Sequence, residues 1–540
     1  MTDWLATRLQ PLLAAIDAPF QWLIGTAGGK PSYEIGHWLF LRALGLIYLI
    51  AFVSLWVQIK GLIGPHGILP AQDYLQALRR YVGPERYRIV PTVLWLDAGG
   101  RALDVVCALG VIGAVLLVAG VWPGGVMLCL WVLYLSLVAA GRDFLSFQWD
   151  VLLLEAGFLA IFLGPWRLWS GRLAPAAPPA LALFLLWWLV FRLTFQSGVV
   201  KLSWGDPTWR GLTALDYHFY TQPLPTWTAW YMHQLPAWLK KLEVVATFGL
   251  EIAVPLLFFG PRSLRLLAVA GTVFFQMAIF ATGNYNFFNL LTIALVLLLV
   301  DDAAWRALLP DTLLARLPAP FPTGAATPGV VRMGLTVLVA AVFLVRGALR
   351  LWDSCFPRTL PPAPLRRLNA WIEPFRSLNG YGLFRVMTTS RPEIIVEGSD
   401  DGALWRAYEF KYKPGDVARR PGFVEPHQPR LDWQMWFAAL GSYESTAWFH
   451  AFLARLLEGT PEVLGLLAAN PFPDHPPRYV RALLYDYRFT TPAERRASRG
   501  VRGEGRGAGW TRTLAGLYSP VVSLTVPLPR PPLPPPSRAP

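Results

Sequence analysis

Charged residues, cysteine and metal-binding patterns are scarce in this sequence. Only 15% of its 540 residues are charged, against about 25% in a typical soluble domain. Three cysteines, Cys107, Cys129 and Cys355, are too few for a disulfide framework. The seven histidines are scattered, with none at a zinc-ligand spacing, and no serine lies in the G-x-S-x-G turn of an α/β-hydrolase. The sequence therefore predicts no metal, no cofactor and no hydrolase of that type.

What the sequence has instead is apolar length. Apolar residues make up 54% of the chain, and they gather in long runs rather than at the spacing of an amphipathic globular core. The pattern predicts an α-helical polytopic membrane protein with about nine transmembrane helices. The predicted spans are Trp38–Ile59, Leu103–Val121, Val126–Ala140, Phe144–Trp166, Leu181–Val200, Leu242–Gly260, Leu264–Thr282, Phe287–Val300 and Val330–Leu349.

Four regions follow one another along the chain. Residues 1–37 predict an amphipathic segment with two internal prolines, which we expect to lie on the membrane surface. Residues 38–351 hold the predicted spans, residues 352–520 are typical of a soluble α+β domain that contains a sheet, and residues 521–540 form a Pro-rich tail. In the soluble region the expected strands are Glu393–Val396, Leu404–Lys413, Tyr479–Phe489 and Trp510–Tyr518, and the expected helices are Leu431–Leu440 and Ser445–Leu457.

The formal net charge is +14, and most of the excess lies in loops and in the C-terminal region. Residues 497–507, ASRGVRGEGRG, have the composition of a flexible Gly/Arg linker, and no nucleic-acid recognition fold accompanies them. We therefore expect membrane lipids rather than nucleic acid as partners. Lys and Arg divide almost evenly between the two sets of alternate loops, with a slight excess that favours a cytoplasmic location for residues 201–241.

Residues 195–225, FQSGVVKLSWGDPTWRGLTALDYHFYTQPLP, form a dense polar and aromatic stretch between two predicted spans. Its candidates for chemistry are Lys201, His218 and Asp206. Lys201 ends an apolar run, so it either snorkels to the interface or acts as a base in a desolvated pocket. Asp206 precedes a proline, which is typical of a turn or helix cap, with a catalytic acid as the alternative.

Ionisable and amide side chains also lie inside or beside the predicted spans, where an unpaired charge is costly. We expect Glu155 or Glu251 to pair with Arg192 and hold helices together, and the alternative is a proton or substrate path. The polar set predicted within the membrane is Asp150, Glu155, Arg192, Glu251, Asn284, Asn286 and Asn289.

Aromatic residues are abundant in the soluble region. An exposed aromatic patch beside the membrane could hold a partially folded client protein, and the candidates for that surface are Trp405, Phe423, Trp433 and Trp436. The alternative is a Trp-rich core with an interfacial belt. The sequence alone leaves both interpretations open.

Several long motifs resemble the lipase maturation factor family. SGVVKL, GDPTW, LTAL and TQPLP lie within residues 195–225, and GNYNFFNLLT, NGYGLFRVMTTSRPEI and RRPGFVEPHQPRLDWQMWFAAL follow in order. The resemblance covers residues 38–520 and departs from the family pattern at Trp204, where serine is expected, and at Tyr220, where glutamate is expected. It implies an integral membrane protein that helps secreted lipases fold, with its C-terminal domain on the lumenal or periplasmic side.

The resemblance thus predicts a membrane-anchored, chaperone-like maturation or assembly factor for secreted proteins, lipases among them. We expect it in a bacterial inner membrane, or in the endoplasmic reticulum if the source is eukaryotic. The FQSGVVKL run also resembles, in outline, the F-x-A-G-x-K-K-L segment of the vitamin K-dependent carboxylase, whose lysine acts as a base. That likeness implies the alternative, a membrane enzyme acting on a lipidic or peptide substrate with Lys201 as base. We favour the interpretation without enzymatic activity.

Overall fold

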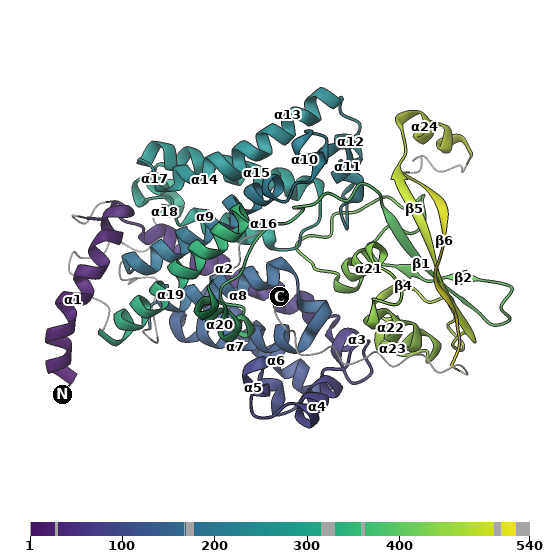
Figure 1. Ribbon diagram of the computed structural model, residues 1–540, viewed down its shortest axis with the longest axis horizontal. Coiled ribbons are helices and arrows are strands. Elements are labelled where there is room, and N and C mark those ends of the chain that lie inside the picture. Colours follow the sequence, from purple (N-terminus) through teal and green to yellow (C-terminus); the bar gives the residue numbers. More distant parts are fainter. Residues whose placement is uncertain are drawn as a thin grey trace.

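The computed structural model describes residues 2–27, 31–166, 168, 178–314, 330–357, 362–501 and 509–524. Figure 1 shows helices along most of the long axis, with helix α1 (Thr2–Leu23) at one end and an antiparallel sheet at the other. Helix α1 continues through both of its prolines, Pro11 and Pro19. The predicted Pro-rich tail lies outside the described residues from position 525 onward.

Seven helices among the described residues are long and apolar enough to cross a membrane. They correspond to seven of the nine predicted spans, and they make the chain an integral membrane protein. In chain order they are α2 (Glu34–Trp56), α6 (Gly100–Ala119), α7 with its 3-10 extension (Pro123–Leu145), α9 (Ala180–Ser203), α13 with its continuation (Ala237–Phe259), α15 (Arg262–Thr282) and α19 (Val330–Cys355).

The other two predicted spans are shorter than expected. Helix α8 (Gln148–Leu163) has 16 residues, or about 24 Å at a helical rise of about 1.5 Å per residue, against a hydrocarbon core of about 30 Å. Helix α16 (Phe288–Leu297) has 10 residues and is followed by α17 (Asp302–Leu308) at a bend of 114°. Asp301 ends the run because its carboxylate caps α17 by accepting the Ala304 N–H. The described residues therefore give seven spans, or eight if the bent pair counts as one, rather than nine.

Short helices occupy the loops at the sheet end of the bundle (Figure 1). After α2 they are α3 (Ile59–Ile63), α4 (Ala71–Tyr81) and α5 (Arg86–Ile89), and after α9 they are α10 (Pro207–Arg210), α11 (Ala214–Thr221) and α12 (Trp227–His233).

The C-terminal domain combines one four-stranded antiparallel sheet, a two-stranded sheet and several helices. Strand order in the larger sheet is β2-β1-β5-β6, and in the smaller sheet β3-β4. Ile394 of β1 lies opposite Leu484 of β5. The elements are α20 (Ala363–Ile372), β1 (Pro392–Ser399), β2 (Arg406–Ala407), β3 (Glu409–Phe410), α21 (Arg430–Leu440), α22 (Ala447–Leu457), α23 (Pro461–Leu464), β4 (Leu467–Ala469), β5 (Tyr479–Phe489), α24 (Pro492–Val501) and β6 (Trp510–Val522).

The predicted strands and helices of this domain are confirmed with one exception. Residues 404–413 do not form one long strand but two short ones, β2 and β3. The chain passes from one sheet to the other at Tyr408, because β2 pairs with β1 and β3 pairs with β4. Beyond β3 the buried Asp432 carboxylate accepts the backbone N–H groups of Tyr412 and Lys413, both at 2.8 Å.

Candidate functional site

The C-terminal domain is joined to the bundle through a buried ion pair. Arg430, in the first turn of α21, donates to both carboxylate oxygens of Asp150, in the first turn of α8, at 2.8 and 2.9 Å. The Tyr134 hydroxyl donates to the same carboxylate at 2.5 Å, and Arg430 also donates to the Phe144 carbonyl at 2.7 Å. Both charged side chains are about fully buried. This bidentate geometry is the strong form of an Arg–carboxylate contact.

A second buried pair lies deeper in the bundle. Arg192 of α9 forms an ion pair with Glu155 of α8, as the sequence suggested. The other oxygen of Glu155 accepts the Tyr381 hydroxyl at 2.7 Å and the Asn379 backbone N–H at 2.8 Å. Arg192 also donates to the Asn379 carbonyl at 3.1 Å. The pair therefore serves two connections, one between spans and one between the bundle and the segment that leads into the C-terminal domain.

The loop after α11 is held by Arg391, which precedes β1. Its guanidinium donates to three carbonyls of that loop, those of Tyr220 (2.6 Å), Gln222 and Pro223 (2.8 Å). The Trp436 indole donates to the Thr221 carbonyl at 2.8 Å. The SRPEI and TQPLP motifs thus bind each other. Because these contacts use backbone carbonyls, the Tyr220 position can depart from the family pattern without losing them.

Asn284 binds the segment just before α21. Its amide donates to the Gly422 carbonyl at 3.0 Å, and its oxygen accepts the Val424 N–H at 2.7 Å. On α2, the Ser54 hydroxyl accepts the Gln428 N–H at 2.8 Å. Asn284, which was predicted to lie within the membrane, and Ser54, which was not, therefore bind backbone groups of the C-terminal domain.

Lys201 is buried rather than snorkelling, because its ammonium is fully engaged. It lies 2.7 and 2.9 Å from the two oxygens of Glu251 and 2.9 Å from the Ser197 carbonyl. An ammonium has three donor hydrogens, and these three acceptors use them all. Of the two carboxylates expected to pair with Arg192, Glu155 does so, and Glu251 pairs with Lys201.

Asp206 caps a helix, whereas His218 packs against an aromatic ring. Asp206 caps α10 by accepting the Thr208 N–H at 2.6 Å, and it also accepts the Met387 N–H of the C-terminal region. Burial acts to raise the pKa of Asp206, but these hydrogen bonds outweigh it and lower the pKa below its usual value. His218 packs edge-on against Phe384, and burial with the nearby Lys201 charge lowers its pKa to about 4, so the imidazole is neutral at pH 7.

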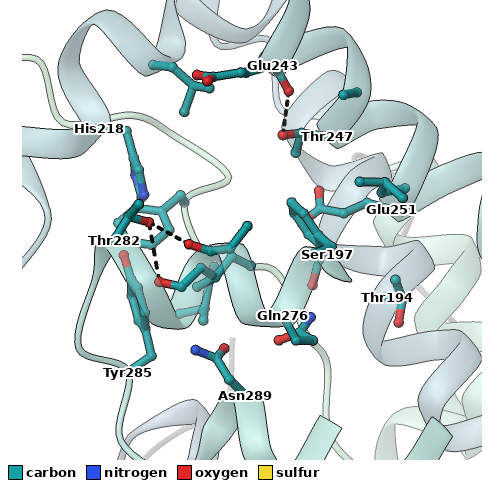
Figure 2. Close-up of a pocket in the computed structure, with 18 of the residues that line it drawn as sticks. Thr194, Ser197, His218, Glu243, Thr247, Glu251, Gln276, Thr282, Tyr285 and Asn289 are labelled. Carbon is teal, nitrogen blue, oxygen red and sulfur yellow. Dashed lines mark hydrogen bonds between the residues drawn. The ribbon is translucent and has the colours of Figure 1, made fainter. Parts of the chain in front are cut away.

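We call the space beside these residues the bundle cavity; it has a volume of about 340 Å³ and a mainly apolar lining. It lies between α9, the α13 continuation, α15 and α16, with α11 at one end. In Figure 2 the labelled side chains face this common space from different elements. They are Thr194, Ser197, His218, Glu243, Thr247, Glu251, Gln276, Thr282, Tyr285 and Asn289, and Lys201 also lines it.

A larger space, the interdomain cleft, lies between the bundle and the C-terminal domain and has a volume of about 850 Å³. Exposed apolar side chains line the cleft from both sides. Trp204, which follows α9, lies on the bundle side, and Val386 and Phe437 lie on the side of the C-terminal domain, Phe437 in α21. The wall between cleft and cavity is formed by Leu383, Phe384 and Tyr285, which border both. Phe384 has a φ of 55°, which is unusual without glycine and turns its ring between His218 and Tyr285.

The four aromatic residues predicted to bind a client do not share one exposed face. Trp433 and Trp436 are 3% and 8% exposed, because Trp433 packs edge-on against Trp149 and Trp436 binds the Thr221 carbonyl. Both still border the interdomain cleft. Phe423, 47% exposed, packs against Trp227, while Trp405 lies under Arg481 at the sheet.

The remaining predicted polar residues are Asn286 and Asn289. Both amide atoms of Asn286 and of Asn289 are buried without a hydrogen-bond partner among the described residues. Asn289 faces the bundle cavity, whereas Asn286 does not line it. Within the described part of the chain, no three His, Cys, Asp or Glu side chains are grouped so as to hold a metal ion.

The chain is similar to known proteins over most of its length. The model of the lipase maturation factor transmembrane domain matches residues 35–307, and that of the lipase maturation factor C-terminal domain matches residues 377–520. Lipase maturation factor 2 of Gallus gallus is 39% identical over 90% of this chain and 81% of its own length. The chain belongs to the lipase maturation factor family. Lipase maturation factor 1 of Mus musculus is 35% identical, covering 95% of this chain and 91% of its own. No solved structure matches the chain.

Within this lipase maturation factor family member, sequence reasoning missed the C-terminal halves of the buried contacts. Arg430, Arg391 and Tyr381 stand in polar, soluble-looking segments, and nothing in their periodicity marks them as buried. The available signal was the number of uncompensated carboxylates in the spans, since each one requires a cation or donor elsewhere in the chain.

Proposed function

We propose that this protein is a membrane-anchored maturation factor for secreted proteins, with lipases as its client class. Its relatives are named lipase maturation factors, and the match extends over both domains. The bundle anchors the C-terminal domain, which faces the compartment into which exported proteins are delivered, periplasm or lumen. Family membership is the observation that carries the proposal, and the open, aromatic cleft between the two domains supports it.

The interdomain cleft suits a segment of an incompletely folded chain. Exposed Trp204 and Phe437 offer large apolar surfaces at opposite walls, 45% and 46% exposed. Around them lie Asp143, Asp353, Arg350 and Arg385, two acidic and two basic groups, so the rim carries no net charge. An apolar centre with a mixed polar rim is the usual form of a protein-binding surface. Such a cleft favours unfolded apolar segments over a charged ligand.

Catalysis with Lys201 as base finds less support. A base needs a free lone pair, but Lys201 donates all three of its hydrogens to Glu251 and Ser197. Asp206 is likewise occupied as a helix cap.

The experiment uses cells that lack this chain and secrete a lipase. We expect the secreted lipase mass to stay similar while its activity per mass falls, and the full-length wild-type chain to restore activity. Phe437→Ala and Trp204→Ala in the cleft should fail to restore it. Leu96→Ala, at a residue that is 92% exposed in a loop of the bundle outside the cleft, serves as the matched control and should restore it fully.

If the cleft variants restore lipase activity as well as Leu96→Ala does, the client does not use the cleft. If Lys201→Arg, which keeps the charge and the ion pair, abolishes restoration while the cleft variants are silent, the enzymatic alternative replaces the proposal. Labelling of single introduced cysteines in the C-terminal domain of intact cells determines on which side of the membrane that domain lies.

A further inference from the structure

We propose that the bundle cavity is a binding site for a neutral lipid that carries free hydroxyl groups and one acyl chain. The inference does not depend on the proposed function. It rests on unmet hydrogen-bond acceptors that line a mainly apolar cavity, on the absence of a spare cation among its lining residues, and on small exposed residues where the cavity meets the membrane.

Three acceptors that line the cavity lack a donor among the described residues. They are the side-chain oxygens Asn289 Oδ1, Gln276 Oε1 and Glu243 Oε2. Asn289 is 1% exposed and Gln276 6% exposed, so solvent outside the protein does not satisfy them. A buried polar atom without a partner is destabilising, and a native fold rarely leaves several of them in one place. A bound molecule with donors would satisfy them.

The chemistry of these atoms selects hydroxyl groups. A hydroxyl donates one hydrogen and accepts through its lone pairs, so each hydroxyl of a bound lipid can donate to one of these acceptors and can also accept from the unpartnered Asn289 Nδ2. A phosphate or carboxylate head offers only acceptors at neutral pH and would leave the three oxygens unmet. The cavity's one cation, Lys201, is fully paired with Glu251, so no positive charge remains to attract an anionic head.

The rest of the lining suits a hydrocarbon chain. Leu250, Phe275, Ile279 and Phe288 contribute apolar side chains to the cavity. A volume of about 340 Å³ lies near the lower end of the range of about 300–1,000 Å³ for small-molecule sites. That size fits one chain better than the two chains of a phospholipid.

The cavity borders the membrane between α13 and α15. Ala246 of α13 and Ala278 of α15 line it and are both exposed on the bundle surface, and the neighbouring Phe274 is 70% exposed. Both helices belong to predicted spans, so these residues face lipid. Small side chains at this position leave a lateral entrance from the bilayer, which a bulky residue would block.

The test uses full-length protein in lipid nanodiscs and a monoacylglycerol with a photoreactive group in its chain. We expect crosslinks to α13, α15 and α16, and we expect unlabelled 1-oleoylglycerol to compete about tenfold better than methyl oleate, which has no hydroxyl. Dioleoylphosphatidylglycerol and dioleoylphosphatidylethanolamine have donors in their head groups but carry two acyl chains, so they should compete no better than methyl oleate. Equal competition by methyl oleate or by either phospholipid would show ordinary boundary lipid and overturn the proposal.

Two variants locate the site. Ala278→Trp should reduce crosslinking about tenfold by filling the entrance, whereas Ala270→Trp, at an exposed alanine two turns earlier on α15 outside the cavity, should leave it unchanged. Gln276→Leu removes one of the three acceptors at similar volume, so it should reduce the advantage of 1-oleoylglycerol over methyl oleate. Crosslinking that is the same in the two tryptophan variants, or an advantage that Gln276→Leu leaves unchanged, would contradict the site.

Discussion

Replacing Arg430 by Met tests whether the buried pair with Asp150 holds the two domains together. The substitution leaves the Asp150 carboxylate, whose side chain is fully buried, with the Tyr134 hydroxyl as its remaining donor. Removing one member of a buried ion pair costs about 3–5 kcal/mol because the other charge stays desolvated. At about 1.4 kcal/mol per factor of ten, a loss of that size raises the undocked population at least a hundredfold.

Hydrogen exchange followed by mass spectrometry measures this population directly. We expect Arg430→Met to speed exchange in α21 and in residues 422–429, which dock on α2 and Asn284, by at least about a hundredfold. The matched control is Arg406→Met, because Arg406 pairs with Asp400 at 3.2 Å while both side chains are exposed. An exposed pair contributes about 0–1 kcal/mol, so the control should change exchange little. Equal effects of the two substitutions would refute the reasoning.

Three further predictions concern stability, measured as thermal unfolding of the purified protein in detergent. Lys201→Met should destabilise the fold by about 3–5 kcal/mol, because it leaves Glu251 buried without its partner. The double variant Lys201→Met/Glu251→Gln should destabilise it clearly less, because no buried charge remains. Equal losses in the two variants would contradict the pairing. Burial raises the pKa of Glu425 to about 9, so the stabilising contribution of the protonated carboxyl is complete below pH 4.5 and is lost as the pH rises through 9. Glu425→Gln should remove this loss of stability with rising pH. A pH profile of the variant identical to that of the wild type would contradict the role of Glu425. Gly61→Ala should lower the melting temperature, because its Cβ would lie 2.3 Å from the backbone oxygen of Glu462 in α23. The control Gly83→Ala should be neutral, because a Cβ at Gly83 meets nothing within 4 Å. Similar melting temperatures of the two variants would contradict the close approach of Gly61 to α23.

The membrane class and most elements could be predicted because their signals are local. Long apolar runs identify α2, α6 and α9 without any tertiary information, and alternation with turn residues identifies β1 and β5. The predicted spans at α8 and α16 were too long, since the sequence shows apolar length but not where a cap such as Asp301 ends a helix. Boundaries depend on side-chain contacts that a hydropathy pattern does not contain.

The composition of the site was predicted, but of its pairings only that of Glu155 with Arg192 was. Glu155, Arg192 and Lys201 were identified from their placement, yet their partners Tyr381 and Glu251 lie 226 and 50 residues away along the chain. Spacing along a sequence gives no information on such contacts. The aromatic candidates failed to form one surface for the same reason, because burial of Trp433 depends on Trp149 of a distant helix.

The most direct measurement places a photocrosslinking amino acid at Phe437, in the interdomain cleft, in cells that are secreting a lipase. The account predicts a crosslink to newly exported, inactive lipase that disappears once the enzyme has matured, and no such crosslink from the same amino acid at Leu96. Crosslinks only to cytosolic proteins, or equal capture from Leu96, would contradict it.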